Sequence, residues 1–248
     1  MKEKYGAKKE KSLMLRFHTQ TAGFSLTAQQ PEINIVRVAI QAMAGVLGGT
    51  QSLHTDSMDE ALALPSEKAV QIALRTQQII AHESGVANVA DPLGGSYYLE
   101  WLTDDMERQA RDYFDRIDSL GGVVPAIEKG FFQKEIAIAA YKYQQEIDNN
   151  ERVVVGVNKF TSDEPVEIPI LEMDPEGFER QCKRLKKLRS NRDKSRHSAS
   201  LTAIEKAAEG DENLMPHFIE AAKAKATLGE MCDVLRGVFG EYREGSDF

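Results

Sequence analysis

Residues 12–53 read SLMLRFHTQTAGFSLTAQQPEINIVRVAIQAMAGVLGGTQSL and predict a strand, a helix and a second strand, in that order. The short apolar run at residues 12–17 is typical of a buried strand, with a helical turn as the alternative at this length. From Pro31 onward, apolar residues recur at helical spacing until the glycine pair at 48–49, so a helix is expected there. Residues 50–53 are long enough for a second strand. A helix between two neighbouring parallel strands favours an α/β fold.

The rest of the chain is predicted to be mostly helical. A β-branched run at residues 152–157 predicts one isolated strand. Thr227 and Glu230 form a capping box for a last helix. Other helices are expected at 66–82, from an N-cap at Thr103 to residue 120, within 124–129, within 133–147, and after an N-cap at Asp174 followed by Pro175.

Composition excludes several classes of protein. The chain has 248 residues, 42% of them hydrophobic, and a formal charge of -8, which argues against bulk electrostatic binding of nucleic acid or anionic membranes. No apolar run approaches the roughly 20 residues of a membrane span, and the start of the chain has no apolar signal region. Cys182 and Cys232 lack the spacing of a zinc cluster, so we expect a cytoplasmic protein without a metal site of its own.

Polar residues around the first predicted strand suggest a binding site. Arg16, His18 and Gln20 alternate along an extended chain and would lie on one side of it. A guanidinium, an imidazole and an amide at the end of a buried strand suit a ligand that carries phosphate or carbonyl groups. A strand whose polar ends simply reach solvent explains the same pattern equally well.

Two further clusters have plainer explanations. His54 stands close to Asp56 and Asp59, as an acid–base pair would, but a polar loop that caps the next helix is the favoured reading. The basic run at residues 183–196 contains leucines at helical spacing and no aromatic residues that could stack on bases. A solvated helix face is therefore favoured over a nucleic-acid site.

Several segments together resemble one family. They are RFHTQTAGFSLT (16–27), GGTQSLHTDSMDEALALP (48–65), ESGVANVADPLGGSYYLEWLT (83–103) and VVVGVNKF (153–160). In this order and at these separations they resemble the large subunit of methylmalonyl-CoA mutase and related adenosylcobalamin-dependent acyl-CoA mutases. The resemblance is close from about residue 11 to 160 and looser through TLGEMCDVLRGVFG (227–240).

The resemblance implies the last two βα units of a (β/α)8 TIM barrel, followed by a C-terminal helical extension. The corresponding domains would be residues 1–90 for the end of the barrel, 91–160 for a helical extension with one short strand, and 161–248 for a C-terminal helical segment. The family's earlier barrel strands, with the residues that grip the acyl group, have no counterpart in these residues. Neither has the cobalamin-binding domain with its cobalt-ligating histidine.

The resemblance also implies ligand contacts, residue by residue. The positions that match CoA-binding positions of the family are Arg16 and His18. The positions that match those lining the corrin and its side-chain amides are Gln20, Gly23, Glu60, Ala61 and Leu64. No catalytic or metal-ligating side chain is implied. Phe24 stands where methylmalonyl-specific members usually carry Trp, so the acyl group stays open.

The implied activity is a radical carbon-skeleton rearrangement of an acyl-CoA, an isomerase reaction in which the cofactor supplies the radical. The chain would act only with partners, namely the N-terminal barrel portion and a cobalamin-binding small subunit that supplies the cobalt ligand, and would be inactive alone. Two alternatives remain at this point. One is a non-catalytic interaction module or remnant of the family, and the other is a helical nucleic-acid binder that uses residues 183–196.

Overall fold

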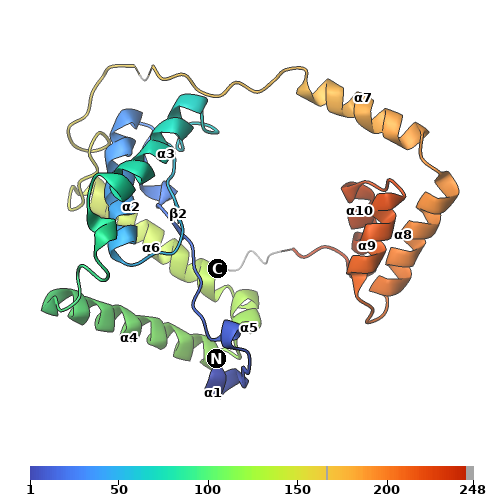
Figure 1. The fold of residues 1–248 in the computed structure, drawn as a ribbon, viewed down its shortest axis with the longest axis horizontal. Helices are drawn as coiled ribbons and strands as arrows, with labels where there is room; N and C mark the ends of the chain where they lie inside the picture. The colour runs from blue at the N-terminus through green and yellow to red at the C-terminus, as the bar shows by residue number, and fades with distance from the viewer. Residues whose placement is uncertain (166, 244–248) are drawn as a thin grey trace. The chain divides into compact units, whose positions relative to one another are not determined.

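The computed structural model describes residues 1–165 and 167–243, and the chain forms two compact units. Unit 1 comprises residues 1–172, and unit 2 begins at residue 173 (Figure 1). Most residues in both units are helical, and a small parallel sheet lies in unit 1, so the mostly helical α/β class predicted from the sequence is confirmed. The domain boundaries at 90 and 160 stay a prediction.

The sheet of unit 1 consists of two very short strands. β1 (Thr19–Gln20) pairs in parallel with β2 (Leu53–His54), so that Thr19 lies opposite Leu53 and Gln20 opposite His54. The Thr19 N–H donates to the Ser52 carbonyl at 2.9 Å, and the Thr21 N–H donates to the His54 carbonyl at 3.1 Å. The predicted order of strand, helix and strand is therefore confirmed.

Both strands lie later in the chain than predicted. Residues 13–18 form no regular element, and Leu15 in the predicted strand is 76% exposed, so the strand at 12–17 is wrong. An apolar run becomes a strand only where a neighbour pairs with it, and the pairing begins at Thr19. The second strand begins at Leu53 rather than residue 50, because the Thr50 N–H still bonds back to the Gly45 carbonyl at the helix end.

Two helices form the core of unit 1. The short 3-10 helix η3 (Pro31–Ile33) leads into α2 (Asn34–Leu47), which joins the strands, and α3 (Glu67–His82) follows β2. Each helix buries residues at a spacing of three or four, so that one face points inward. Both predicted helices are confirmed. The buried apolar side chains of this core are Leu26, Val38, Ala42, Met58, Ala69, Ala73 and Ile80.

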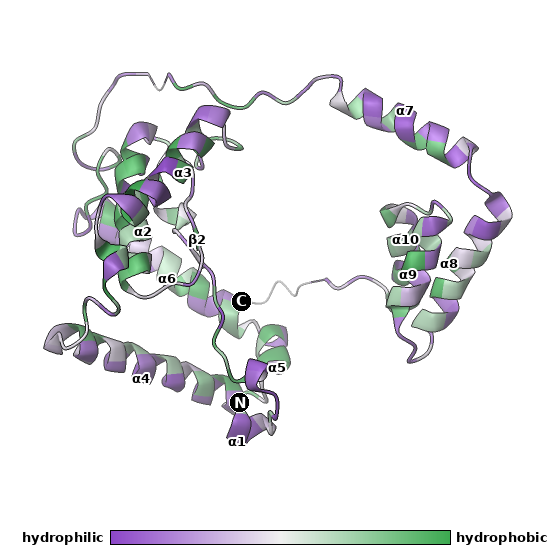
Figure 2. Ribbon diagram, in the orientation of Figure 1, coloured by the Kyte–Doolittle hydropathy of each residue, from purple (hydrophilic) through white to green (hydrophobic). Residues whose placement is uncertain are grey.

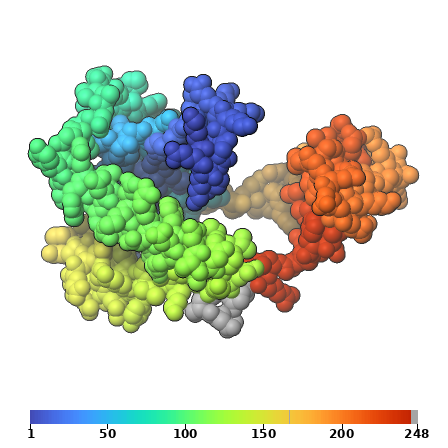
Figure 3. Space-filling view, turned by 90° about the horizontal axis from the view of Figure 1, so that it is seen from below, coloured from blue at the N-terminus to red at the C-terminus, as the bar shows by residue number. Residues whose placement is uncertain are grey.

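Three helices follow the core in unit 1. They are α4 (Tyr97–Ser119), α5 (Val123–Glu128) and α6 (Phe131–Asp148). Thr103 is not an N-cap, because its hydroxyl donates to the Leu99 carbonyl inside α4. Glu135 on α6 accepts hydrogen bonds from Arg116 and Tyr113 of α4. No residue of α4 is buried, and its atoms, drawn in green, lie open to view in Figure 3.

The predicted strand at residues 152–157 is wrong. The only pairing there is an isolated bridge between Val155 and Lys159. The Asn158 side chain accepts from the Val154 N–H at 2.8 Å and donates to the Arg152 carbonyl at 2.8 Å. These bonds close the segment into a turn, since they take up backbone groups that a strand would offer to a neighbour. The remaining short elements of unit 1 are α1 (Lys2–Tyr5), η1 (Glu10–Ser12), η2 (Gly23–Ser25) and η4 (Val86–Asn88).

The regular elements among the described residues of unit 2 are all helices. Its helices are α7 (Gly177–Ser190), α8 (Lys194–Ala208), α9 (Leu214–Lys223) and α10 (Leu228–Phe239). The last three pack together and bury small apolar side chains, including Ala207 and Ala221. The capping box of Thr227 and Glu230 is confirmed. Helix α7 begins two residues after Pro175, because the Asp174 carboxylate accepts the N–H of Glu176 in a turn that precedes it.

Glu230 should make the stability of unit 2 depend on pH. The two guanidinium nitrogens of Arg192 each donate to this carboxylate at 2.8 Å, and the pairing lowers the pKa of Glu230 well below its ordinary range. Because the folded-state pKa lies below the unfolded one, this stabilisation is complete above the unfolded pKa of about 4.3 and is lost as the pH falls through the folded pKa. We expect Glu230→Gln to cost about 1.5–3 kcal/mol at pH 7.

Hydrogen–deuterium exchange of α8–α10 amides in the full chain measures this effect. In the wild type, protection should fall on acidification, whereas in Glu230→Gln it should be low at pH 7 already and change less with pH. Glu220→Gln is the matched control, because Glu220 pairs with Lys223 on the exposed surface. Equal protection of wild type and Glu230→Gln at pH 7 would contradict the prediction.

Candidate functional site

Asp56 joins the segments that follow the two strands. Its side chain is fully buried. One carboxylate oxygen accepts from Nε2 of Gln20 at 2.8 Å, and the other accepts from the Thr21 hydroxyl at 2.9 Å. The Asp56 N–H in turn donates to the Thr21 hydroxyl oxygen at 2.9 Å. The carboxyl ends of β1 and β2 are therefore fixed to each other by side-chain bonds as well as by the backbone.

The acid–base hypothesis for His54 gains little from this geometry. His54 is 56% exposed, and its Nε2 lies 3.6 Å from the nearer Asp56 oxygen, beyond hydrogen-bond distance. Asp59 is buried, accepts from the Ser57 hydroxyl at 2.6 Å and from the Ser66 N–H at 2.9 Å, and so fixes the loop that leads into α3. Among residues 1–165 and 167–243, no group of three or more His, Cys, Asp and Glu side chains could hold a metal ion.

The structure brings three of the predicted corrin-facing residues together at the carboxyl ends of the strands. A Cβ atom on Gly23 would lie 3.6 Å from Oε1 of Glu60 and 3.6 Å from Oδ2 of Asp56, and Gln20 is bonded to the same Asp56. Ala61 and Leu64 lie in the loop just after Glu60, and the Leu64 side chain is 62% exposed. Gly23 and Ala61 together are called the small-residue shelf below. The exposed polar residues Gln20 and Glu60 and the apolar Leu64 belong to the same segments.

Arg16 and His18 lie at the opposite end of the sheet. They precede β1, so the prediction that Arg16 stands where a buried strand ends is wrong. Nδ1 of His18 and the Ser52 hydroxyl lie 2.7 Å apart, and the Phe17 N–H donates to the Gln51 side chain at 2.9 Å. These residues line a shallow open hollow together with Arg16. Within the described part of the chain, the Arg16 guanidinium makes one hydrogen bond, to the Met14 sulfur, and has no acidic partner, so it is free to bind an anion.

Sequence reasoning missed Asn34 and Arg37. The Asn34 side chain is fully buried, accepts from the Thr27 N–H at 3.1 Å and donates to the carbonyls of Thr27 and Met58, both at 2.9 Å. Arg37 donates to the Asn34 side-chain oxygen at 2.7 Å and to the Val155 carbonyl at 2.7 Å. Together they connect the loops that follow β1 and β2 to residue 155. The available signal was a row of polar side chains at helical spacing, Asn34, Arg37 and Gln41, on a largely apolar helix.

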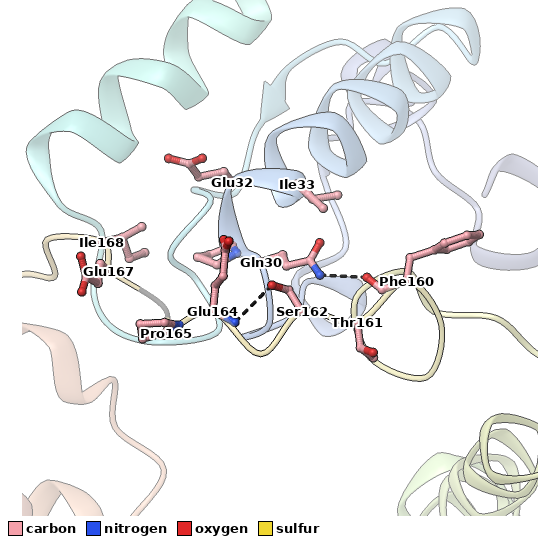
Figure 4. A pocket seen from close by; sticks show the side chains of 11 residues that line it. Gln30, Glu32, Ile33, Phe160, Thr161, Ser162, Glu164, Pro165, Glu167 and Ile168 are labelled. Atoms are coloured by element: carbon pink, nitrogen blue, oxygen red, sulfur yellow. Dashed lines mark hydrogen bonds between the residues drawn. The ribbon is translucent and has the colours of Figure 1, made fainter.

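Another hollow lies elsewhere in unit 1. It measures about 610 Å³, and residues 30–33 form it with residues 160–162, 164, 165, 167 and 168. Figure 4 shows the Gln30 amide reaching across to the Phe160 carbonyl, which accepts its hydrogen bond at 2.9 Å. None of the predicted site residues lines this hollow. Its position gives no reason to move the candidate site away from the two sheet ends.

The basic run at residues 183–196 is divided between two helices. Helix α7 ends at Ser190, and Asp193 caps α8 by accepting the N–H groups of Ser195 and Arg196. Acidic partners face several of its charges: Arg192 with Glu230 at 2.8 Å, Arg196 with Glu220 at 3.8 Å and Lys183 with Glu179 at 3.8 Å. Figure 2 shows hydrophilic residues along much of α7. The favoured reading of a solvated face agrees with this arrangement.

Comparison with known proteins decides the family. The family model described as methylmalonyl-CoA mutase matches residues 1–241. The chain belongs to the methylmalonyl-CoA mutase family. The resemblance found in the sequence is thereby confirmed over nearly the whole chain.

Individual members of the methylmalonyl-CoA mutase family match this chain over almost its whole length. The 2-hydroxyisobutanoyl-CoA mutase large subunit of Aquincola tertiaricarbonis is 46% identical over 98% of this chain and 44% of its own length. Methylmalonyl-CoA mutase of Escherichia coli is 45% identical over 96% of this chain and 34% of its own length. The human mitochondrial methylmalonyl-CoA mutase is 45% identical over 95% of this chain and 32% of its own length. The chain thus spans less than half the length of these relatives.

These mutase relatives differ in the acyl group that their names give, although their identity to the chain is almost the same. Overall identity therefore does not choose between the two acyl groups. Across the described residues, no helix is long and apolar enough to cross a membrane.

Proposed function

We propose that residues 1–248 are part of an adenosylcobalamin-dependent acyl-CoA mutase and contribute surfaces that face CoA and the corrin. The observation that carries the proposal is the match to the methylmalonyl-CoA mutase family over residues 1–241. The geometry adds a free guanidinium at one end of the sheet and a small-residue shelf at the other. In this proposal the two ends serve two different ligands.

In the same proposal, β1 and β2 are the last two strands of a (β/α)8 barrel. Parallel strands are normally buried on both faces and paired on both edges, and a sheet of two strands leaves an edge of each unpaired. A partner would supply the remaining barrel strands, and a cobalamin-binding subunit would supply the cobalt ligand. Free Cys182 and Cys232 suit a reducing compartment, and we place the complex in the cytoplasm.

The residues at the carboxyl ends of the strands fit a broad ring with an amide-bearing rim. Gly23 presents no side chain beside Glu60 and Asp56, and a flat ligand would meet its bare backbone there. Gln20 and Glu60 are exposed there and offer polar atoms to amides, while Phe24 is 85% exposed and Leu64 62%, which offers apolar contact. When bound, the cofactor supplies the radical chemistry, and these side chains bind and orient it.

Arg16 should bind a phosphate of CoA. Its guanidinium has no acidic partner among the described residues and lies beside His18 in the open hollow, where a phosphate could accept two hydrogen bonds from it. In the reconstituted complex, Arg16→Ala should raise KM for acyl-CoA by an amount equivalent to about 1.5–3 kcal/mol. Adenosylcobalamin affinity should not change.

Arg75→Ala is the matched control for Arg16→Ala. Arg75 is an exposed arginine of α3 that donates to Gln78 and lies outside the hollow, so its loss should leave KM unchanged. If Arg16→Ala left KM unchanged, or weakened cobalamin binding alone, this end of the sheet would not be the CoA site.

Reconstitution tests the proposed function as a whole. The chain is co-expressed with the barrel portion and the cobalamin-binding chain of a relative, and the purified complex is assayed with methylmalonyl-CoA and with 2-hydroxyisobutanoyl-CoA. Adenosylcobalamin-dependent isomerisation of either ester supports the proposal. A stable complex that isomerises neither ester would instead support the non-catalytic interaction module.

A further inference from the structure

The Asp56 carboxylate can take part in hydrogen bonds only as an acceptor. An ionised carboxylate accepts and cannot donate, and both of its oxygens are already used, one by Gln20 and the other by Thr21. The Asp56 side chain is fully buried, so solvent does not replace these partners. The acceptor position beside Gln20 is therefore fixed.

This arrangement determines which end of the Gln20 amide faces outward. The amide carries a donor nitrogen and an acceptor oxygen, and only the nitrogen can bond to a carboxylate. With Nε2 held 2.8 Å from Asp56, the carbonyl oxygen Oε1 lies on the other branch of the amide group. No residue in the described part of the chain donates to Oε1, and Gln20 is exposed. Gln20 thus presents an unused acceptor.

Asp56 itself is held independently of Gln20. Its backbone N–H donates to the Thr21 hydroxyl, and the same hydroxyl donates back to its carboxylate. This reciprocal pair sets the carboxylate in place even when the Gln20 side chain moves. Thr21 therefore fixes the position of the Asp56 carboxylate, and Asp56 in turn fixes the orientation of the Gln20 amide.

We propose that Asp56 is a positioning residue that makes Gln20 present its carbonyl oxygen to a primary amide N–H on the rim of the bound corrin. This inference rests on the proposed function and adds to it a residue that no ligand has to touch. It also specifies the chemistry at this contact, because the ligand atom opposite Gln20 must be a hydrogen-bond donor.

A double-mutant cycle in the reconstituted complex tests the inference. The dissociation constant of adenosylcobalamin is measured by equilibrium dialysis for wild type, Gln20→Ala, Asp56→Ala and the double variant. Each single variant should weaken binding about tenfold, the worth of one hydrogen bond. If Asp56 acts through Gln20, the double variant should also be only about tenfold weaker, whereas independent roles would give about a hundredfold.

If Asp56→Ala does not fold, Asp56→Asn takes its place in the double-mutant cycle. Asn keeps the volume and one acceptor oxygen but also offers a donor, so the Gln20 amide is free to turn round. We expect Asp56→Asn to bind about threefold more weakly than wild type. Asp56→Asn combined with Gln20→Ala should be about tenfold weaker, the same as Gln20→Ala alone, because residue 56 no longer matters once the Gln20 amide is removed.

The outcomes separate the two proposals. The positioning role would be wrong if the two single losses of affinity multiply in the double variant, or if Asp56→Asn binds adenosylcobalamin like wild type. Binding by the wild-type complex would still support the proposed function in either case. A wild-type complex that binds no adenosylcobalamin would overturn the proposed function and this inference with it.

Discussion

A polypeptide of residues 1–248 alone is expected to show no turnover of methylmalonyl-CoA or 2-hydroxyisobutanoyl-CoA at saturating adenosylcobalamin. In the proposed function, the residues that grip the acyl group and the histidine that ligates cobalt lie on other chains. Mass spectrometry of the CoA esters measures the conversion.

The control for this assay is the methylmalonyl-CoA mutase of Escherichia coli, which should convert its ester under the same conditions. Addition of the barrel portion and the cobalamin-binding chain should then restore turnover to the polypeptide. Isomerisation by the purified polypeptide without any added chain would overturn the proposed division of the site between chains.

Asn34→Ala should be among the most destabilising single changes in unit 1. The substitution leaves the Thr27 N–H and the carbonyls of Thr27 and Met58 without their buried partner. Each lost partner costs roughly 1 kcal/mol, so we expect a decrease of about 3 kcal/mol in the free energy of unfolding. Denaturant unfolding of the full chain measures the decrease in the free energy of unfolding. Hydrogen exchange of the α2 amides then locates the loss of stability in unit 1.

Glu32→Ala is the matched control for Asn34→Ala. Glu32 stands two residues earlier, in η3, and is exposed, so its loss should change stability by less than about 0.5 kcal/mol. A loss of stability in Asn34→Ala no larger than in Glu32→Ala would show that the backbone groups around Asn34 find water instead.

Helices were more predictable from the sequence than strands. The apolar periodicity of α2 and α3 is a local property, and it located both helices within about three residues. A strand depends on a partner that lies far away in the sequence. Residues 12–17 have strand-like composition but pair with no neighbour in the described part of the chain, and residues 152–157 make only the isolated bridge at Val155, so neither became a regular strand.

The residues of the candidate site also differ in how far the sequence predicts them. Residues that match a family motif were found at once, because they stand in contiguous segments. The bond between Gln20 and Asp56 spans 36 positions and leaves no pattern in one sequence. The wrong position of Arg16 follows from the strand that was placed too early, since the end of the sheet to which it belongs depends on where pairing begins.

The open surface of α4 provides an optical probe. Trp101, the only tryptophan in the chain, lies on this helix, is 61% exposed and stacks on Tyr98 with ring centroids 6.2 Å apart. Indole fluorescence shifts to shorter wavelength when water around the ring is replaced by protein. The emission spectrum of the unmodified chain therefore reports whether an added partner covers α4, and a partner chain that lacks tryptophan makes the signal specific to this one helix.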